Sequence, residues 1–165
     1  MIVRKKTSEL PAYQQALGLL VRREHSRREL KRKLTQRGKD AGEIDAALET
    51  LSRQDFQNDE RFAQALARSR QSAGYGPIRI RAEMSQHALD GETVEQAISA
   101  LACDWLDMAK DLIERRYLRK IQANPAQTRK AVDFLLRRGF DTRTAYAAAR
   151  VADWADGAEN LPEDP

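Results

Sequence analysis

The chain has 165 residues, a formal net charge of +4 and 6% aromatic residues, with 25 alanines but only 12 valines and isoleucines. Strands favour β-branched and aromatic residues, so this composition predicts an all-α protein. No apolar run approaches the roughly 20 residues that cross a bilayer, the first residues lack an apolar signal segment, and the single cysteine excludes an internal disulfide. We therefore expect a cytoplasmic protein with no membrane attachment, no metal site and no cofactor.

Nine helices are predicted in chain order from apolar periodicity and from helix-end residues. Ser26 and Glu29 form a capping box, in which the serine oxygen accepts a backbone N–H and the glutamate reaches back to the serine. Gly38 and Gly139 suit the left-handed residue that follows a helix. Two N-cap candidates and two first-turn prolines complete the set: Asp90, Asp141, Pro77 and Pro125. The predicted helices cover residues 12–24, 26–37, 42–52, 58–72, 77–88, 92–102, 103–122, 126–138 and 142–155.

The apolar positions repeat about every 50 residues, which indicates tandem structural units. Five pairs of apolar residues are separated by this shift: Leu30 and Ile80, Leu34 and Met84, Ile44 and Val94, Leu48 and Ile98, and Leu51 and Leu101. One three-helix unit buries too little apolar surface to be stable alone, so three such repeats should stack into an elongated, curved array. The expected segments are a flexible tail (1–11), three repeats (12–53, 54–102 and 103–155) and a flexible acidic tail (156–165).

Basic and acidic blocks alternate along the chain. The net charges are +8 for residues 1–40, −4 for 41–65, +4 for 66–81, −7 for 82–114, +6 for 115–130 and −3 for 131–165. Clustered cations raise the local potential and favour a polyanionic partner. The first group of candidate contact residues has few acids near it in sequence and comprises Arg22, Arg23, Arg27, Arg28, Lys31, Arg32 and Lys33. The groups that recur in the later repeats, and that would continue one basic edge, comprise Arg68, Arg70, Arg79, Arg81, Arg115, Arg116, Arg119 and Lys120.

The loop Gly74-Tyr75-Gly76-Pro77 lacks the preceding strand and the lysine of a phosphate-binding loop. We interpret it as a tight connection in which Pro77 opens the next helix, with Arg79 and Arg81 placed to meet an anion near that helix start. The acidic blocks lie mainly on the third helices. We interpret them as solvated residues that balance the basic edge, with a second contact face for a basic protein surface as the alternative.

No pattern marks a catalytic site. His25 and His87 lie far apart in sequence, and Cys103 is interpreted as a small core residue rather than a nucleophile. No carboxylate spacing indicates an acid–base pair. Five aromatic residues lie on helical stripes and are expected in the core: Trp105, Trp154, Tyr117, Phe134 and Phe140.

One segment is specific enough to indicate a family. Residues 59–84, which contain Gly74-Tyr75-Gly76-Pro77 followed by Arg79 and Ile80, resemble the middle repeat of the RecX family, the regulators of RecA recombinase. Residues 16–38 resemble the first repeat and residues 130–140 the third, and the resemblance covers residues 12–152. The family tends to have Lys-Gly after the second helix of its middle repeat, where this chain has His87-Ala88. A left-handed residue other than glycine costs on the order of 1 kcal/mol at such a position.

The resemblance implies a non-enzymatic, all-helical regulator of three-helix repeats. Such a protein binds the RecA filament on single-stranded DNA and suppresses its ATPase, recombinase and coprotease activities, and it can bind DNA, including duplex DNA. We expect a monomer. A direct DNA-binding protein of the helix-turn-helix type stays open as an alternative, although the acidic third helices argue against their entering a major groove. A tetratricopeptide-like scaffold would need a 34-residue period, which the sequence lacks.

Overall fold

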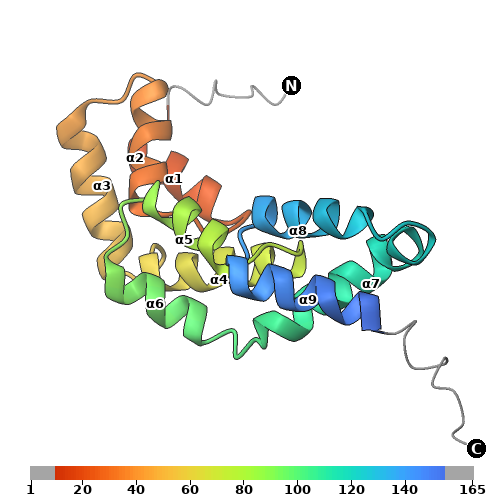
Figure 1. Cartoon of the computed structure of the whole chain (residues 1–165). Coiled ribbons are helices and arrows are strands. Elements are labelled where there is room, and N and C mark those ends of the chain that lie inside the picture. The colour runs from red at the N-terminus through yellow and green to blue at the C-terminus, as the bar shows by residue number, and fades with distance from the viewer. Residues whose placement is uncertain (1–9, 155–165) are drawn as a thin grey trace, which may run out of the picture. The chain divides into compact units, whose positions relative to one another are not determined.

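The computed structural model describes residues 10–154, with side chains up to residue 150, and this part of the chain contains nine helices and no strand (Figure 1). The predicted all-α class is therefore confirmed. The helices are α1 (Ala12–Leu20), α2 (Arg27–Gln36), α3 (Ala41–Arg53), α4 (Asp59–Ser72), α5 (Pro77–Ser85), α6 (Gly91–Ser99), α7 (Trp105–Ala123), α8 (Gln127–Arg138) and α9 (Thr142–Trp154).

The helices divide into two compact units. Unit 1 holds the residues up to Leu66 together with Met84–Ala97, and unit 2 holds Ala67–Glu83 and the residues from Ile98 onward. The boundaries fall inside α4, α5 and α6, so the middle three helices contribute to both units. The repeat boundaries at residues 53, 102 and 155 stay a prediction.

The core of unit 1 lies among α1, α2 and α3. Leu30 and Leu34 of α2 are fully buried with Leu48 and Leu51 of α3, and Ala16 allows α1 to pack closely on α3 because its side chain is small. Ile44 is buried as well, and of the five residues that the 50-residue shift pairs with Leu30, Leu34, Ile44, Leu48 and Leu51, four are also buried, while Leu101 is half-buried. The period therefore marks inward-facing positions.

The core of unit 2 lies among α7, α8 and α9. Ala145 and Ala149 share one face of α9 and are fully buried in the same cluster as Ile113 and Leu135. The small side chains let α9 approach α7, which is its main packing partner. Among the aromatic residues predicted in the core, Phe134 and Phe140 are buried and Trp105 and Tyr117 are half-buried against the cluster, while Trp154 lies beyond the side chains that the structure describes.

The predicted helix ends are correct where a side chain or a glycine fixes them. Ser26 accepts the Glu29 N–H, Asp90 and Asp141 accept N–H groups three residues on, and Pro77 opens α5. Gly38 and Gly139 have φ angles of 76° and 87°.

The largest error is at the end of α1, which stops at Leu20 rather than at residue 24. The segment after it is rich in helix-forming residues, but Arg23 and Glu24 pair with Glu29 and Arg61 instead of continuing the helix. Helices α5 and α6 also end three residues early, and Ala88 and Ala102 adopt positive φ angles in the turns that follow.

At the start of α8, Pro125 lies two residues before the helix instead of in its first turn. Asn124 accepts the Ala126 N–H at 3.0 Å, which holds the chain in a turn ahead of Gln127. At the start of α7, Asp104 accepts two N–H groups, so the helix begins at Trp105 rather than at residue 103.

Candidate functional site

The same junction between successive repeats occurs once in each unit. In unit 1 it joins the residues around Ser26, before α2, to His87, just after α5. In unit 2 it joins the loop before α5 to Arg138, the last residue of α8. A shift of 50 residues carries Ser26 onto Gly76, and a shift of 51 carries His87 onto Arg138. The two junctions therefore have equivalent positions but different side chains.

In unit 2, the loop between α4 and α5 is fixed by backbone contact with the end of α8. The Gly76 N–H donates to the Arg138 carbonyl at 2.8 Å, and the Ile78 N–H donates to the Gly139 carbonyl at 3.0 Å. A Cβ atom at Gly76 would collide with the Gly139 carbonyl, and one at Gly139 would collide with Arg79. The Gly-Tyr-Gly-Pro motif is thus a tight connection, as predicted, and its glycines let two backbones approach closely.

Arginine and aromatic side chains alternate beside this loop. Arg79 and Arg138 lie over the ring of Tyr75, with their guanidinium carbons 5.3 Å and 4.9 Å from its centroid. Arg138 and Arg116 lie over the ring of Phe134 at 5.1 Å and 5.2 Å. A guanidinium over a ring face is held by cation–π attraction, while its N–H groups remain in its own plane to bind oxygen atoms. We call these five residues the arginine–aromatic cluster.

The positive charge of this cluster is not neutralised within the described part of the chain. The ion pairs there leave Arg79, Arg116 and Arg138 without a carboxylate partner, although Arg138 also donates to the Ala73 carbonyl at 2.6 Å. Neighbouring cations differ from them: Arg70 is bound bidentately by Glu83, and Arg115 by Asp111 at 2.8 Å. Three permanently charged groups on rigid supports are therefore available to an anionic partner.

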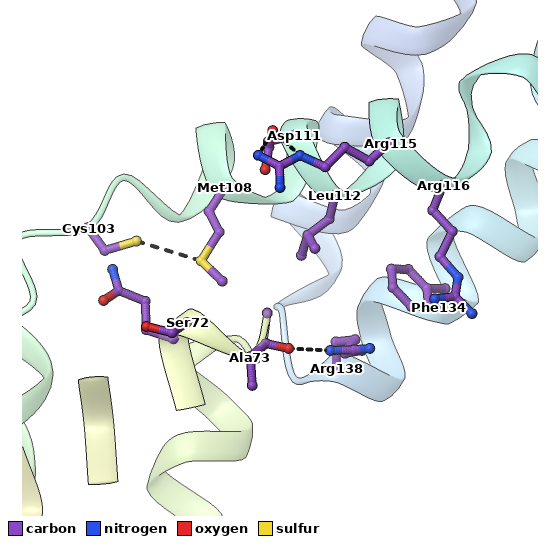
Figure 2. A pocket seen from close by; sticks show the side chains of 12 residues that line it. Ser72, Ala73, Cys103, Met108, Asp111, Leu112, Arg115, Arg116, Phe134 and Arg138 are labelled. Carbon is purple, nitrogen blue, oxygen red and sulfur yellow. Dashed lines mark hydrogen bonds and ion pairs between the residues drawn. The ribbon is translucent and has the colours of Figure 1, made fainter. Parts of the chain in front are cut away.

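A cavity of about 620 Å³ opens beside the cluster within unit 2. Arg115, Arg116 and Arg138 lie at one part of its wall, and Met108, Leu112 and Phe134 provide an apolar part. Figure 2 shows Arg116 beside the ring of Phe134, Arg138 reaching the Ala73 carbonyl, and Leu112 pointing from α7 toward the α4–α5 loop. The cavity thus combines positive charge with apolar surface.

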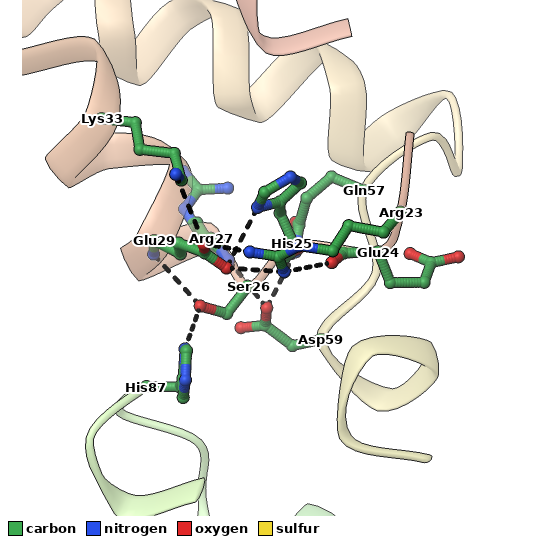
Figure 3. A network of polar contacts seen from close by, with 10 residues as sticks. All are labelled: Arg23, Glu24, His25, Ser26, Arg27, Glu29, Lys33, Gln57, Asp59 and His87. Carbon is green, nitrogen blue, oxygen red and sulfur yellow. Dashed lines mark hydrogen bonds and ion pairs between the residues drawn. The ribbon is translucent and has the colours of Figure 1, made fainter. Parts of the chain in front are cut away.

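The equivalent junction in unit 1 contains acids and histidines instead (Figure 3). Glu29 occupies the position that corresponds to Arg79, and its buried carboxylate lies 2.6 Å from Arg23 and 3.0 Å from His25 Nδ1. Burial acts to raise the pKa of Glu29, but hydrogen bonds from Arg23 and His25 outweigh it and hold that pKa below its ordinary value. Burial lowers the pKa of His25. The charged groups of this junction are therefore paired with one another, although Glu24 Oε2 is buried without a hydrogen-bond partner in the described structure.

The predicted capping box forms only in part. Ser26 Oγ accepts the Glu29 N–H at 3.1 Å and lies 2.8 Å from His87 Nδ1. The Glu29 carboxylate turns to Arg23 and His25 rather than to the Ser26 N–H. Ser26 thus links the start of α2 to the turn after α5 inside unit 1.

The first group of predicted contact residues is less available than the sequence suggested. Arg23 and Lys33 pair with Glu29, and the carboxylates of α3 engage two further cations: Lys31 with Asp45 at 2.7 Å, and Arg27 with Glu49 at 3.7 Å. Few acids lie near this group in sequence, but packing brings the carboxylates of α3 against α2. Those of the group with no carboxylate partner in the described structure are Arg22, Arg28 and Arg32, and the last two line a smaller cavity of about 410 Å³.

The remaining predicted contacts are exposed, but the structure brings only some of them together. Lys120 lies over the ring of Tyr117, while Arg68, Arg81 and Arg119 lie on exposed helix surface. The basic edge that would link them stays a prediction. Sequence reasoning missed Arg138, because it lies in a block of negative net charge. The 51-residue shift from His87 reaches its position, but the contact of His87 with Ser26 is known only from the structure.

Other chemistry has no support among the residues that the structure describes. No group of three or more metal-ligating side chains occurs there, and no helix in that part is long and apolar enough to cross a membrane. Cys103 is half-buried rather than in the core, with its sulfur 3.8 Å from that of Met108.

Comparisons with known proteins agree on one family. Sequence models of the first and second three-helix domains of RecX match residues 12–51 and 58–98. "Regulatory protein RecX" of Xanthomonas axonopodis pv. citri (strain 306) is 46% identical over 146 residues, which is 88% of this chain and 90% of the relative. The protein of that name from Stenotrophomonas maltophilia (strain R551-3) is 46% identical over 89% of this chain and 90% of its own length. The crystal structure of RecX from Lactobacillus salivarius matches with a TM-score of 0.73 at 22% identity, covering 87% of this chain and 95% of that one.

Proposed function

We propose a RecA-directed function for this chain, because it belongs to the RecX family of regulatory proteins. The chain binds the RecA filament on single-stranded DNA and inhibits its ATPase, recombinase and coprotease activities. It acts without catalysis of its own, as a cytoplasmic monomer.

The arginine–aromatic cluster carries this proposal. A filament of RecA on DNA presents phosphates and carboxylates at regular intervals, and three guanidiniums on rigid elements, without a carboxylate partner among the described residues, suit such a partner. Arginine keeps its charge at any physiological pH, and the rings beneath Arg79, Arg116 and Arg138 hold the side chains in place.

Contacts from more than one part of the chain strengthen the binding. Arg28 and Arg32 of unit 1 are exposed and unpaired in the described structure, so they would supply a second, weaker contact. Several weak contacts on one molecule raise the overall affinity through effective concentration. The paired cations of α2 would contribute less, because binding through them must first break ion pairs.

The direct test titrates the purified protein into RecA that hydrolyses ATP on single-stranded DNA. Inhibition should rise to saturation, and a double variant, Arg79→Glu with Arg81→Glu, should lose most of it. The matched control is Arg129→Glu with Lys130→Glu, which makes the same charge change at exposed positions of α8 outside the cluster. An unchanged ATPase rate at saturating protein contradicts the proposal.

A parallel titration into DNA alone addresses the alternative function. Tight, sequence-selective binding to duplex DNA at physiological salt would favour a helix-turn-helix reader instead. In the structure, Asp45 and Glu49 of α3 are engaged with α2, which does not favour α3 as a recognition helix.

A further inference from the structure

The cavity of unit 2 has the chemistry of a site for one particular kind of anion. Its wall carries Arg115, Arg116 and Arg138 but only one carboxylate, Asp111, and that carboxylate is bound to Arg115. Two guanidiniums therefore face this space without an acidic partner in the described residues. Their positions are set by Phe134, whose ring lies under both.

Another part of the wall is apolar, while Gln71 and Ser72 add polar groups elsewhere. Met108, Leu112 and Phe134 line the cavity, and a Leu112 methyl carbon lies 3.2 Å from the place where a Cβ of Gly74 would be. A volume of about 620 Å³ is in the range of pockets that enclose a small ligand. A polar ion alone would leave the apolar wall in contact with water, whereas a carboxylate next to an apolar side chain would cover both surfaces.

The aromatic rings argue against a nucleobase in this space. Phe134 is only 8% exposed, and both it and Tyr75 already have guanidinium groups over their faces. Binding of single-stranded nucleic acid commonly uses aromatic faces on which bases stack. Here those faces are occupied.

The junction of unit 1 differs from that of unit 2 in its charge. There the chain supplies its own carboxylate, Glu29, whose side chain is 7% exposed and contacts both Arg23 and His25. In unit 2 the corresponding residue is Arg79, so this junction has a cation at the position where the junction of unit 1 has an acid. Among the described residues, the second junction therefore has no carboxylate at the position that Glu29 occupies in the first.

We infer that the cavity of unit 2 binds an acidic peptide segment of a protein partner, with a carboxylate held by Arg116 and Arg138 and an adjoining apolar side chain against Leu112 and Met108. Both guanidiniums donate N–H groups to the carboxylate, and no covalent step is involved. The identity of the partner rests on the proposed function, but the chemistry of the site does not.

Binding of labelled peptides tests this inference. The probes are a short fluorescent peptide in which glutamate alternates with leucine, the same peptide with glutamine in place of glutamate, and a fluorescent oligothymidylate. The full-length protein should bind the glutamate peptide and not the glutamine peptide. Arg116→Gln should weaken binding of the glutamate peptide about tenfold, which is about 1.4 kcal/mol, because a hydrogen bond between two charged groups is lost.

The matched control is Arg119→Gln, which removes the same charge one turn along α7 and outside the cavity. Both arginines are exposed, so both variants should keep the helical circular dichroism and melting temperature of the parent. Equal weakening by the two variants would show attraction by net charge alone and would overturn the inference. Binding of oligothymidylate but not of the glutamate peptide, with loss in Arg116→Gln, would assign the site to nucleic acid and overturn it too.

The RecA assay separates this inference from the proposed function. If the protein inhibits RecA but the glutamate peptide does not bind, the proposed function stands and the peptide site is wrong. If the peptide binds through Arg116 but RecA is unaffected, the site is supported and the RecA-directed function is contradicted.

Discussion

Replacing Ala88 by glycine should raise the free energy of unfolding by about 1 kcal/mol. Ala88 follows the second helix of the middle repeat with φ at 56°, whereas Gly38 and Gly139 occupy the equivalent positions at 76° and 87°. The left-handed conformation costs a residue with a Cβ atom about 1–2 kcal/mol. Glycine removes that cost, but it loses about 0.5–1 kcal/mol more conformational entropy on folding. The net gain in unfolding free energy is therefore smaller than the cost removed.

Two further substitutions show that backbone conformation is the cause. Gly38→Ala should cost about 1 kcal/mol, because a Cβ there meets no atom within 4 Å and only the positive φ angle opposes it. Ala46→Gly makes the same chemical change as Ala88→Gly at an exposed position inside α3. It should destabilise the fold by about 1 kcal/mol, since glycine is unfavourable within a helix.

Urea unfolding followed by circular dichroism measures all three effects. With a urea dependence of about 2 kcal/mol per molar, the midpoint should rise by about 0.5 M in Ala88→Gly and fall by as much in the other two. If Ala88→Gly lowers the midpoint as Ala46→Gly does, the residue is not strained and the reasoning is refuted.

Three other substitutions probe the two junctions. Burial lowers the pKa of His25 below its ordinary value of 6.5, so at lower pH the unfolded chain binds a proton that the folded chain does not, and the folded state loses stability. His25→Gln should reduce this loss of unfolding free energy below pH 6.5. An unchanged pH dependence of the unfolding free energy, measured by urea titration, would contradict the lowered pKa. Ser26→Ala should lower the unfolding free energy by about 1–2 kcal/mol, because α2 loses its N-cap. The control is Ser52→Ala at an exposed position. An equal loss of unfolding free energy in the two variants would exclude the capping role of Ser26. Gly76→Ala should lower the unfolding free energy by more than about 2 kcal/mol, because the added Cβ meets the Gly139 carbonyl. It should also speed cleavage of unit 2 by proteases. Protease resistance equal to that of the parent would contradict the close contact.

Most of the helical fold could be predicted from local signals. Caps such as Ser26 and Asp141 act on backbone groups within three residues, and the residues that begin or end these helices are near them in sequence. The end of α1 could not be predicted in this way. It depends on Arg23 and Glu24, whose partners include Arg61, 37 residues farther along the chain.

The sequence predicts that the candidate site contains exposed cations, but it does not predict which cations form the site. The charge blocks correctly indicate surface cations, yet they give no information about which cations meet an acid after folding. Lys31 and Asp45 lie in blocks of opposite charge and become partners when α3 packs on α2. Arg138 lies in an acidic block, but it becomes central because its neighbours in space are Tyr75 and Phe134.

The hydrogen bonds between the Gly76 loop and the end of α8 have a consequence for synthesis on the ribosome. The hydrogen bond from the Gly76 N–H can form only after the Arg138 carbonyl, 62 residues later in the chain, has been synthesised. Unit 1 is complete once residue 97 has emerged, because all of its segments lie before that point. Since domains generally fold as they are synthesised, unit 1 should close first. The loop between α4 and α5 would then stay without its partner until the end of α8 leaves the exit tunnel.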